Sequence, residues 1–354
     1  MVIAEVSRTV EEDALRIAAS ELPWEQLGGC RIAVTGAGGF LGSYLVRTLL
    51  ALGMSGRTDP AVQVVAMVRD LDAARKVYGD VHADAGLELV SLDLSTLGVP
   101  DIQPPDYVIH AASQASPRYY GTDPVGTFLP NALGTAALLR WIQHGIAPRG
   151  FLFISSSEVY GSTSSQAPLT EREYGTLDPA QVRSCYAEGK RAGEALCVAW
   201  HAQFGLPTYI VRPFHTYGPG LKPDDGRVFA DFAFNVLRGE NIVMKSDGSA
   251  RRAFCYAADA VEAFFTVLLK GEPAIPYNVG NPDAELSVME LAELLVGLFP
   301  ERNLMVEKHA PPSAGYLAST FQRLMPDVSA LRALGWQPRT TPEAGFRRMI
   351  GAYQ

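Results

Sequence analysis

The sequence contains little that is typical of a secreted, metal-binding or membrane protein. It has four cysteines in 354 residues, and none of them forms a CxxC pair or lies near a histidine at metal-ligand spacing. We therefore expect reduced thiols, no metal and a cytoplasmic protein. Acidic residues interrupt every apolar run at the N-terminus, which is unlike an export signal. No uncharged stretch reaches the ~18 residues of a membrane span, so no membrane partner is expected.

Positive charge is also scarce. Lys and Arg number 30 against 38 Asp and Glu, which gives a formal net charge of −8. This balance argues against a nucleic-acid partner, and an anionic ligand would need local arginines. Apolar residues make up 47% and charged residues 19%, as in ordinary globular proteins. A chain longer than the usual ~100–200 residues of one domain predicts a large core with an appended lobe.

Short apolar runs alternate with amphipathic segments through much of the chain. We expect strands at 31–34, 62–68, 87–94, 107–112, 151–155 and 208–211, and helices at 41–52, 124–144 and 186–204. This alternation predicts an α/β fold with a Rossmann-type, doubly wound parallel sheet.

The domain organisation follows from changes in this pattern. Helical periodicity over residues 8–22, ended by Pro23, makes 1–29 an N-terminal helical extension; an oligomer contact is the alternative role. We expect residues 30–212 to form the Rossmann-type domain, to which about 252–280 returns. Beyond Pro213 the alternation stops, so 213–251 and 281–354 are expected to form a smaller, substrate-binding lobe.

A glycine-rich turn follows the first expected strand and opens the first expected helix. Gly36, Gly39 and Gly42 give the spacing GxxGxxG, with Phe40 and Leu41 inside it. Missing side chains permit the tight turn and let a pyrophosphate approach the helix N-terminus, where free amides favour anions. The position of the turn predicts a dinucleotide site.

A second motif predicts proton transfer beside that site. Tyr186 and Lys190 are four residues apart and share one helix face. A neighbouring ammonium would lower the pKa of the tyrosine from ~10, which would make it a usable base near neutral pH. The dinucleotide would supply the oxidant.

The glycine spacing with YxxxK downstream resembles the extended short-chain dehydrogenase/reductase family, the NAD-dependent epimerases and dehydratases that modify nucleotide sugars. The resemblance runs from about Arg31 to the C-terminus and is nearest to the UDP-glucuronate decarboxylases. It rests on HAASQASP at 110–117, CYAEGKR at 185–191, RPFHTYGP at 212–219, DGRV at 225–228, RAF at 252–254, NVGNP at 278–282 and Pro326-Asp327.

The resemblance implies a set of cofactor residues. Asp93 and Leu94 would contact the adenine. Ala111 and Ala112, which end the fourth expected strand, and Ser113, which follows it, would contribute at the same edge. After the second strand an NAD enzyme usually has an acidic residue for the ribose. Here Asp70 could fill that role, or Arg69 could accept the 2′-phosphate of NADP. We favour NAD, because the expected chemistry regenerates its cofactor in place.

The catalytic set implied by the resemblance adds residues at the end of the fifth strand. Ser156 and Ser157 would hold the sugar hydroxyl and stabilise an oxyanion beside Tyr186. Glu158 would help to expel or orient a carboxylate; a turn-capping carboxylate is the alternative.

The expected substrate residues are more widely spread. Arginines bind diphosphates and carboxylates bidentately, and aromatic side chains can flank a uracil or a sugar. His215 replaces the asparagine of the related group, so it is either a substrate contact or a core histidine. The candidates are Ser116, Tyr119, Tyr120, His215, Arg227, Arg252 and Arg323.

The resemblance implies NAD-dependent oxidation at C4 of a nucleotide sugar, with UDP favoured. Decarboxylation of a UDP-glucuronate-like substrate would follow, to a UDP-pentose or a 4-keto pentose, and we expect a homodimer. A 4-epimerase is the alternative, since it needs only the Tyr, Lys and Ser set. A 4,6-dehydratase is less favoured, because Ser157 stands where such enzymes have an aspartate. A non-enzymatic Rossmann regulator would commonly lack Tyr186.

Overall fold

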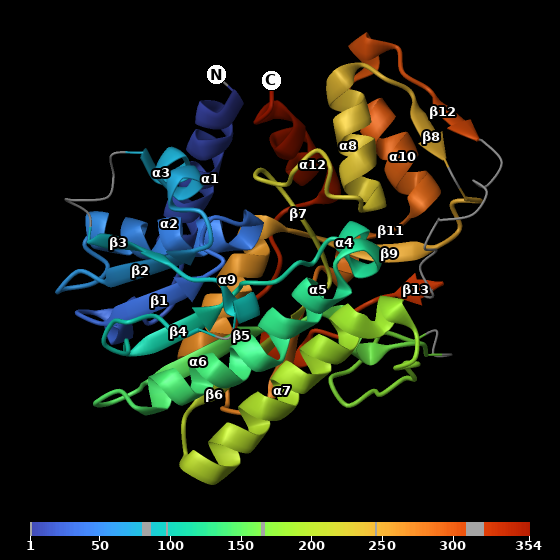
Figure 1. The fold of residues 1–354 in the computed structure, drawn as a ribbon. Coiled ribbons are helices and arrows are strands. Elements are labelled where there is room, and N and C mark those ends of the chain that lie inside the picture. Colours follow the sequence, from blue (N-terminus) through green and yellow to red (C-terminus); the bar gives the residue numbers. More distant parts are fainter. Residues whose placement is uncertain (1, 80–85, 97, 164–166, 245, 309–321) are drawn as a thin grey trace.

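A seven-stranded parallel sheet forms the centre of the molecule (Figure 1). The computed structural model describes residues 2–354 except 80–85, 97, 164–166, 245 and 309–321. The strand order is β10-β6-β5-β4-β1-β2-β3, and every neighbouring pair is parallel. The strands are β1 (Arg31–Thr35), β2 (Gln63–Val68), β3 (Leu87–Ser91), β4 (Tyr107–His110), β5 (Gly150–Ile154), β6 (Thr208–Pro213) and β10 (Pro276–Val279). This confirms the predicted α/β fold.

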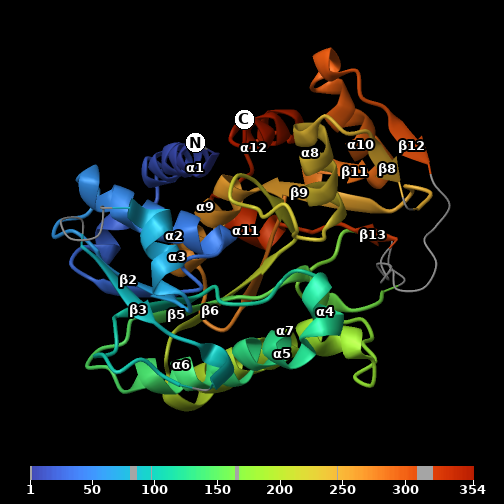
Figure 2. The ribbon, with the colours of Figure 1, turned by 45° about the horizontal axis from the view of Figure 1, so that its top comes forward.

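Helices cover both faces of the sheet (Figure 2). On β1, Ile32 and Val34 face the core that includes α1, α2 and α9, whereas Ala33 faces the core that includes α6 and α7. This alternation is the period-two pattern of a strand buried on both sides. The helices of this part are α1 (Val2–Ala18), α2 (Phe40–Met54), α3 (Leu71–Tyr78), α4 (Arg118–Thr122), α5 (Pro124–Asn131), α6 (Leu133–Gln143), α7 (Cys185–Phe204) and α9 (Ala257–Lys270).

The single helix expected over 124–144 is two helices, α5 and α6. Pro130 lies within α5 and has no amide hydrogen to continue the helical bonding. The backbone at Ala132, with φ −101° and ψ −74°, separates the two. The Pro130 carbonyl oxygen lies 3.0 Å from Nε2 of His110.

The rest of the chain forms a second layer of smaller sheets and helices. Strand β9 (Arg251–Tyr256) pairs with β7 (His215–Tyr217), β11 (Glu285–Ser287) and β13 (Arg323–Leu324), and β8 (Ile242–Met244) pairs with β12 (Val306–Lys308). The helices are α8 (Val228–Arg238), α10 (Val288–Gly297), α11 (Ser329–Ala333) and α12 (Pro342–Gly351). After β9 the chain returns to the central sheet through α9 and β10. The exact domain boundaries stay predictions, and residues 1 and 309–321 of the expected extension and lobe lie outside the described part.

No helix of the described residues is long and apolar enough to cross a membrane. The same residues contain no group of three or more His, Cys, Asp or Glu side chains that could hold a metal ion.

Candidate active site

A cavity of about 1810 Å³, here called the cleft, opens where the carboxyl ends of the central strands meet the second layer. Ligands of open parallel sheets bind at this edge. Every site residue expected from the sequence lines the cleft except Arg323. The guanidinium of Arg323 instead binds both carboxylate oxygens of Glu285, at 2.6 and 2.9 Å.

The glycine turn is packed so closely that two of its positions exclude side chains. Gly36 has φ +65°, and a Cβ there would lie 2.7 Å from the Cα of Ala112. A Cβ on Gly42 would lie 2.1 Å from the carbonyl oxygen of Gly36. Gly39 is the N-cap of α2 and offers no side-chain oxygen to the first amides of that helix. These amides and the helix dipole therefore favour an anion in the cleft.

Unpaired polar atoms beside this turn also fit a bound dinucleotide. Within the described residues, Ser113 Oγ and Gln114 Oε1 are buried and have no hydrogen-bond partner. Both residues line the cleft. Because buried polar atoms are normally paired, a ligand is the natural partner for them.

The two acidic residues expected near the adenosine both cap short helical turns. Asp70 Oδ1 accepts from the amide of Ala73 at 2.9 Å and so caps α3. Asp93 Oδ1 accepts from the hydroxyl and amide of Ser95, and these hydrogen bonds lower the pKa of Asp93. Arg69 is exposed beside them at the cleft. The choice between Asp70 and Arg69 as the ribose contact stays a prediction.

Tyr186 and Lys190 lie together on α7, with the Lys190 nitrogen 5.8 Å from the centre of the tyrosine ring. Lys190 Nζ donates to the carbonyl of Ile154 at 2.6 Å. Burial raises the pKa of Tyr186 to about 12, while a hydrogen bond with Ser156 acts in the opposite direction. Burial also lowers the pKa of Lys190 to about 7. The pKa of Tyr186 is thus raised, not lowered as the sequence predicted, because burial disfavours the charged phenolate; the effect of Lys190 on it stays a prediction.

The serines that follow β5 occupy different positions. Ser156 is the N-cap of the 3-10 turn η4 (Ser157–Tyr160), and its hydroxyl accepts from the amide of Glu158 at 3.2 Å. The Ser156 side chain also opposes the rise in the pKa of Tyr186. Ser157 is the next residue and is also buried at the cleft. Of the two serines, Ser156 is the one whose side chain affects the pKa of Tyr186.

Glu158 forms an ion pair that the sequence analysis missed. Arg183 Nη1 and Nη2 lie 3.2 and 3.5 Å from the two carboxylate oxygens of Glu158. The guanidinium also lies 5.6 Å from the centre of the Tyr120 ring, which is stacked on Tyr186 at 5.1 Å. The two residues are 25 positions apart in the sequence, so no local spacing could have indicated the pair.

The opposite wall of the cleft carries two cations and a neutral histidine. Arg252 is buried and donates to the carbonyl of Arg251 at 2.7 Å, and Arg227 pairs with Asp225 at 2.9 Å. Burial and the two arginines lower the pKa of His215 well below its usual value. His215 Nδ1 is buried and has no partner among the described residues. A neutral ring between two guanidinium groups can donate to a ligand without adding charge.

The remaining expected substrate residues lie between these two walls. Ser116 donates its hydroxyl hydrogen to the carbonyl of Asp225 and so joins the loop after β4 to the second layer. Tyr119 is half-buried under the guanidinium of Arg118, 4.8 Å from its ring centre. Both residues line the cleft.

His110 belongs to the HAASQASP motif at 110–117 and fixes the end of β4, a role that the sequence did not indicate. Its Nε2 must donate to the carbonyl of Pro130, at 3.0 Å, so its Nδ1 accepts from the Thr35 hydroxyl at 2.8 Å. The Thr35 oxygen in turn accepts from the amide of Ala112 at 3.1 Å. This chain holds the loop that forms one wall of the cleft.

Comparison with known proteins agrees with this geometry. Residues 32–280 match the model of the NAD dependent epimerase/dehydratase family. The chain belongs to this family. That membership confirms the resemblance inferred from the glycine turn and the Tyr186–Lys190 pair.

Several relatives of this chain are named UDP-glucuronic acid decarboxylases. The chain is 35% identical to UDP-glucuronic acid decarboxylase 6 of Arabidopsis thaliana over 324 residues, which cover 90% of this chain and 87% of that protein. It is 33% identical to UDP-glucuronic acid decarboxylase 1 of Xenopus tropicalis, over 90% of this chain and 71% of that protein.

Solved structures of the family share the fold. A dTDP-glucose 4,6-dehydratase from Streptomyces venezuelae, with NAD bound, aligns with a TM-score of 0.75 at 26% identity, over 91% of this chain and 96% of that one. A UDP-glucuronic acid 4-epimerase from Bacillus cereus, in complex with UDP-glucuronic acid and NAD, aligns with a TM-score of 0.74 at 24% identity, over 91% and 98%.

Proposed function

We propose that this family member is an NAD-dependent UDP-glucuronate decarboxylase. The observation that carries the proposal is the Glu158–Arg183 ion pair in the cleft, on the same wall as Tyr186 and Ser156. A site for neutral hexoses has no need of such a pair, whereas a uronic acid brings a carboxylate that can compete for the guanidinium. Relatives at 32–35% identity that bear the decarboxylase name support the same conclusion.

NAD⁺ fits the side of the cleft formed by Gly36–Gly42, Asp70, Asp93 and Ala111–Ser113. Bound there, it would supply reversible hydride transfer at C4 of the sugar. Gly39 and the first amides of α2 would hold the pyrophosphate, and Asp70 the ribose. The exposed Arg69 is the competing ribose-side contact.

Residues of the cleft would then transfer the proton and stabilise the charge that develops on the sugar. Tyr186 would take the proton of the C4 hydroxyl, with Ser156 holding that oxygen. Once C4 is a ketone, the carboxylate on C5 is β to it, so carbon dioxide can leave with its electron pair delocalised onto the C4 oxygen. The protonated Tyr186 and the nearby Ser157 would stabilise this enolate. Reprotonation of C5 completes the loss of carbon dioxide.

Glu158 and Arg183 would act on the departing carboxylate. Arg183 would orient it, and Glu158 would disfavour its charged form, a repulsion that ends when neutral carbon dioxide forms. Arg227, Arg252 and His215 on the opposite wall would bind the diphosphate and the sugar. Arg323, whose guanidinium binds Glu285, stays a predicted substrate residue.

We also propose a cytoplasmic homodimer. All four cysteines are free, as expected in a reducing compartment. Val125, Leu133 and Val198 are exposed apolar side chains on the neighbouring helices α5, α6 and α7, a surface that pairing with a second copy would cover.

The decisive experiment is incubation of the purified protein with a panel of UDP-, dTDP-, GDP- and CDP-sugars, with the products identified by mass. Loss of one carbon dioxide from UDP-glucuronate is the expected result. Unchanged mass with inverted C4 would instead identify a 4-epimerase, and loss of water a 4,6-dehydratase.

A further inference from the structure

Helix α1 lies outside the segment that matches the family model, yet it is fastened to both layers of the molecule. Its buried Asp13 accepts hydrogen bonds from three elements. Tyr256 Oη donates at 2.6 Å, Tyr44 Oη of α2 at 3.3 Å and Arg348 Nε of α12 at 3.0 Å. Arg16 adds an ion pair with Asp259 of α9 at 3.0 Å. These polar contacts join α1 to the central sheet layer and to the C-terminal helix together.

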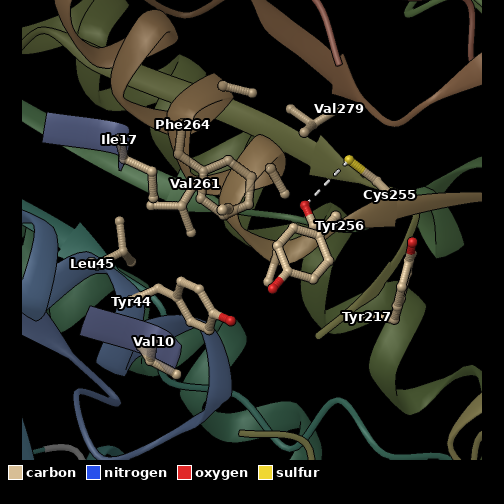
Figure 3. Close-up of a cluster of buried hydrophobic side chains, with 14 of the residues drawn as sticks. Val10, Ile17, Tyr44, Leu45, Tyr217, Cys255, Tyr256, Val261, Phe264 and Val279 are labelled. Carbon is tan, nitrogen blue, oxygen red and sulfur yellow. Dashed lines mark hydrogen bonds between the residues drawn. The ribbon is translucent and has the colours of Figure 1, made fainter. Parts of the chain in front are cut away.

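An apolar stripe on the same helix is part of the main core. Val10 and Ile17 point into the cluster that contains Leu45, Val261 and Phe264 (Figure 3). Val10 is 3% exposed and Ile17 fully buried. The inner face of α1 is therefore used within the chain, which leaves only its outer face for the oligomer contact considered from the sequence.

The N-terminal part of α1 reaches the cleft. Val6, Ser7 and Val10 line it beside the residues of α2 and α3 that stand behind the glycine turn. Arg47 of α2, 8% exposed, joins the three helices: its Nη2 donates to Ser7 Oγ and to the carbonyl of Val77, both at 2.6 Å. The same guanidinium forms an ion pair with Glu11.

Helix α3 connects α1 indirectly to the glycine turn. Tyr78, the residue after Val77, donates its hydroxyl hydrogen to the carbonyl of Ala37 in the glycine turn, at 2.5 Å. Asp70, the expected ribose contact, caps the opposite, N-terminal end of the same helix. Val6, Ser7 and Val10 of α1 therefore line the cleft on the side of α2 and α3.

We infer that α1 is a wall of the dinucleotide side of the cleft, and that it slows release of the bound cofactor. The inference rests on the proposed function in one respect, namely that the cleft takes NAD. A hydride taken from C4 can return to the same sugar only if the cofactor stays bound, so slow release suits that chemistry. Release past α1 requires breaking the contacts of Arg47 with Ser7 and Glu11, while Asp13 keeps the helix in place.

The test measures cofactor release without any sugar. Protein loaded with NADH is mixed with excess NAD⁺, and the loss of bound NADH fluorescence gives the dissociation rate. Ser7→Ala removes the hydroxyl that Arg47 binds, and Asp13→Asn weakens the anchor without changing its shape; each should accelerate release by about tenfold, as a lost hydrogen bond of ~1.4 kcal/mol would. Arg8→Ala is the matched control, because Arg8 lies exposed on the outer face of the same helix.

The two variants test the role of α1 independently. Ser7→Ala leaves the Asp13 anchor intact, so its release rate tests the inference even if Asp13→Asn unfolds the protein. If folded Ser7→Ala protein binds NADH and releases it at the rate of the native protein, α1 does not slow cofactor release. The proposed function is unaffected by that result. Native protein that binds no dinucleotide overturns both.

Discussion

Tyr186, the proposed base, has a buried hydroxyl. Its pKa is raised to about 12, and the contacts that oppose this effect come from Ser156 and Arg227. Both contributions come from residues that line the cleft.

We predict that Tyr186→Phe lowers turnover by about a hundredfold or more, as loss of a general base does. The ring that stacks on Tyr120 is kept, so the melting temperature should not change. Steady-state turnover and thermal unfolding measure the two effects. Near-normal turnover would remove Tyr186 from the mechanism.

The Glu158–Arg183 pair is the second residue-scale feature to test. Glu158→Gln keeps the shape and removes the charge, so carbon dioxide release from UDP-glucuronate should fall while C4 oxidation persists, seen as NADH absorbance. Glu188→Gln is the control, because Glu188 lies on α7 near Arg191 and does not line the cleft. Equal carbon dioxide release by the Glu158 variant and the native protein would refute the role of the carboxylate.

At the scale of single elements, strand ends and helix starts carry the cofactor site. The amide of Ala73 binds Asp70, so this aspartate both begins α3 and faces the cleft. Its two roles can be separated by substitution.

Asp70→Ala should cost about 0.5–2 kcal/mol of stability through the lost cap and should also reduce the preference for NAD over NADP. Asp70→Asn keeps a capping oxygen, so it should lose the preference with less loss of stability. Calorimetric titration with each dinucleotide, beside urea unfolding, distinguishes the effects. Tighter NADP binding by the native protein would assign the ribose contact to Arg69.

The end of β4 should make the fold sensitive to acid. Burial lowers the pKa of His110 to about 3, below its usual value of 6.5, so the unfolded chain binds a proton between these two values and the folded chain does not. Stability should therefore decline as the pH falls from about 6.5 toward 3. In His110→Gln, the free energy of unfolding in urea should change less between pH 7 and pH 5 than it does in the native protein. An equal change would mean that other groups cause the loss of stability.

For the whole molecule, the exposed apolar residues on α5–α7 predict how two copies associate. Leu133→Glu or Val198→Glu should shift the protein from dimer to monomer in sedimentation, because a carboxylate is costly to bury in an apolar interface. Ile146→Glu is the control, since Ile146 is fully exposed in the turn after α6. A native protein that sediments as a monomer would contradict the dimer itself.

Local sequence signals determined the central sheet, the glycine turn and the Tyr186–Lys190 pair. Each depends on residues that are near in sequence: strand periodicity, missing Cβ atoms after β1, and a four-residue helical spacing. Tertiary structure decided what depends on distant contacts. It paired Arg183 with Glu158, directed Arg323 to Glu285, and brought α1 to the cleft through Arg47 and Asp13. It also set the pKa of Tyr186, because burial is produced by the packing of the whole chain and cannot be read from a four-residue motif.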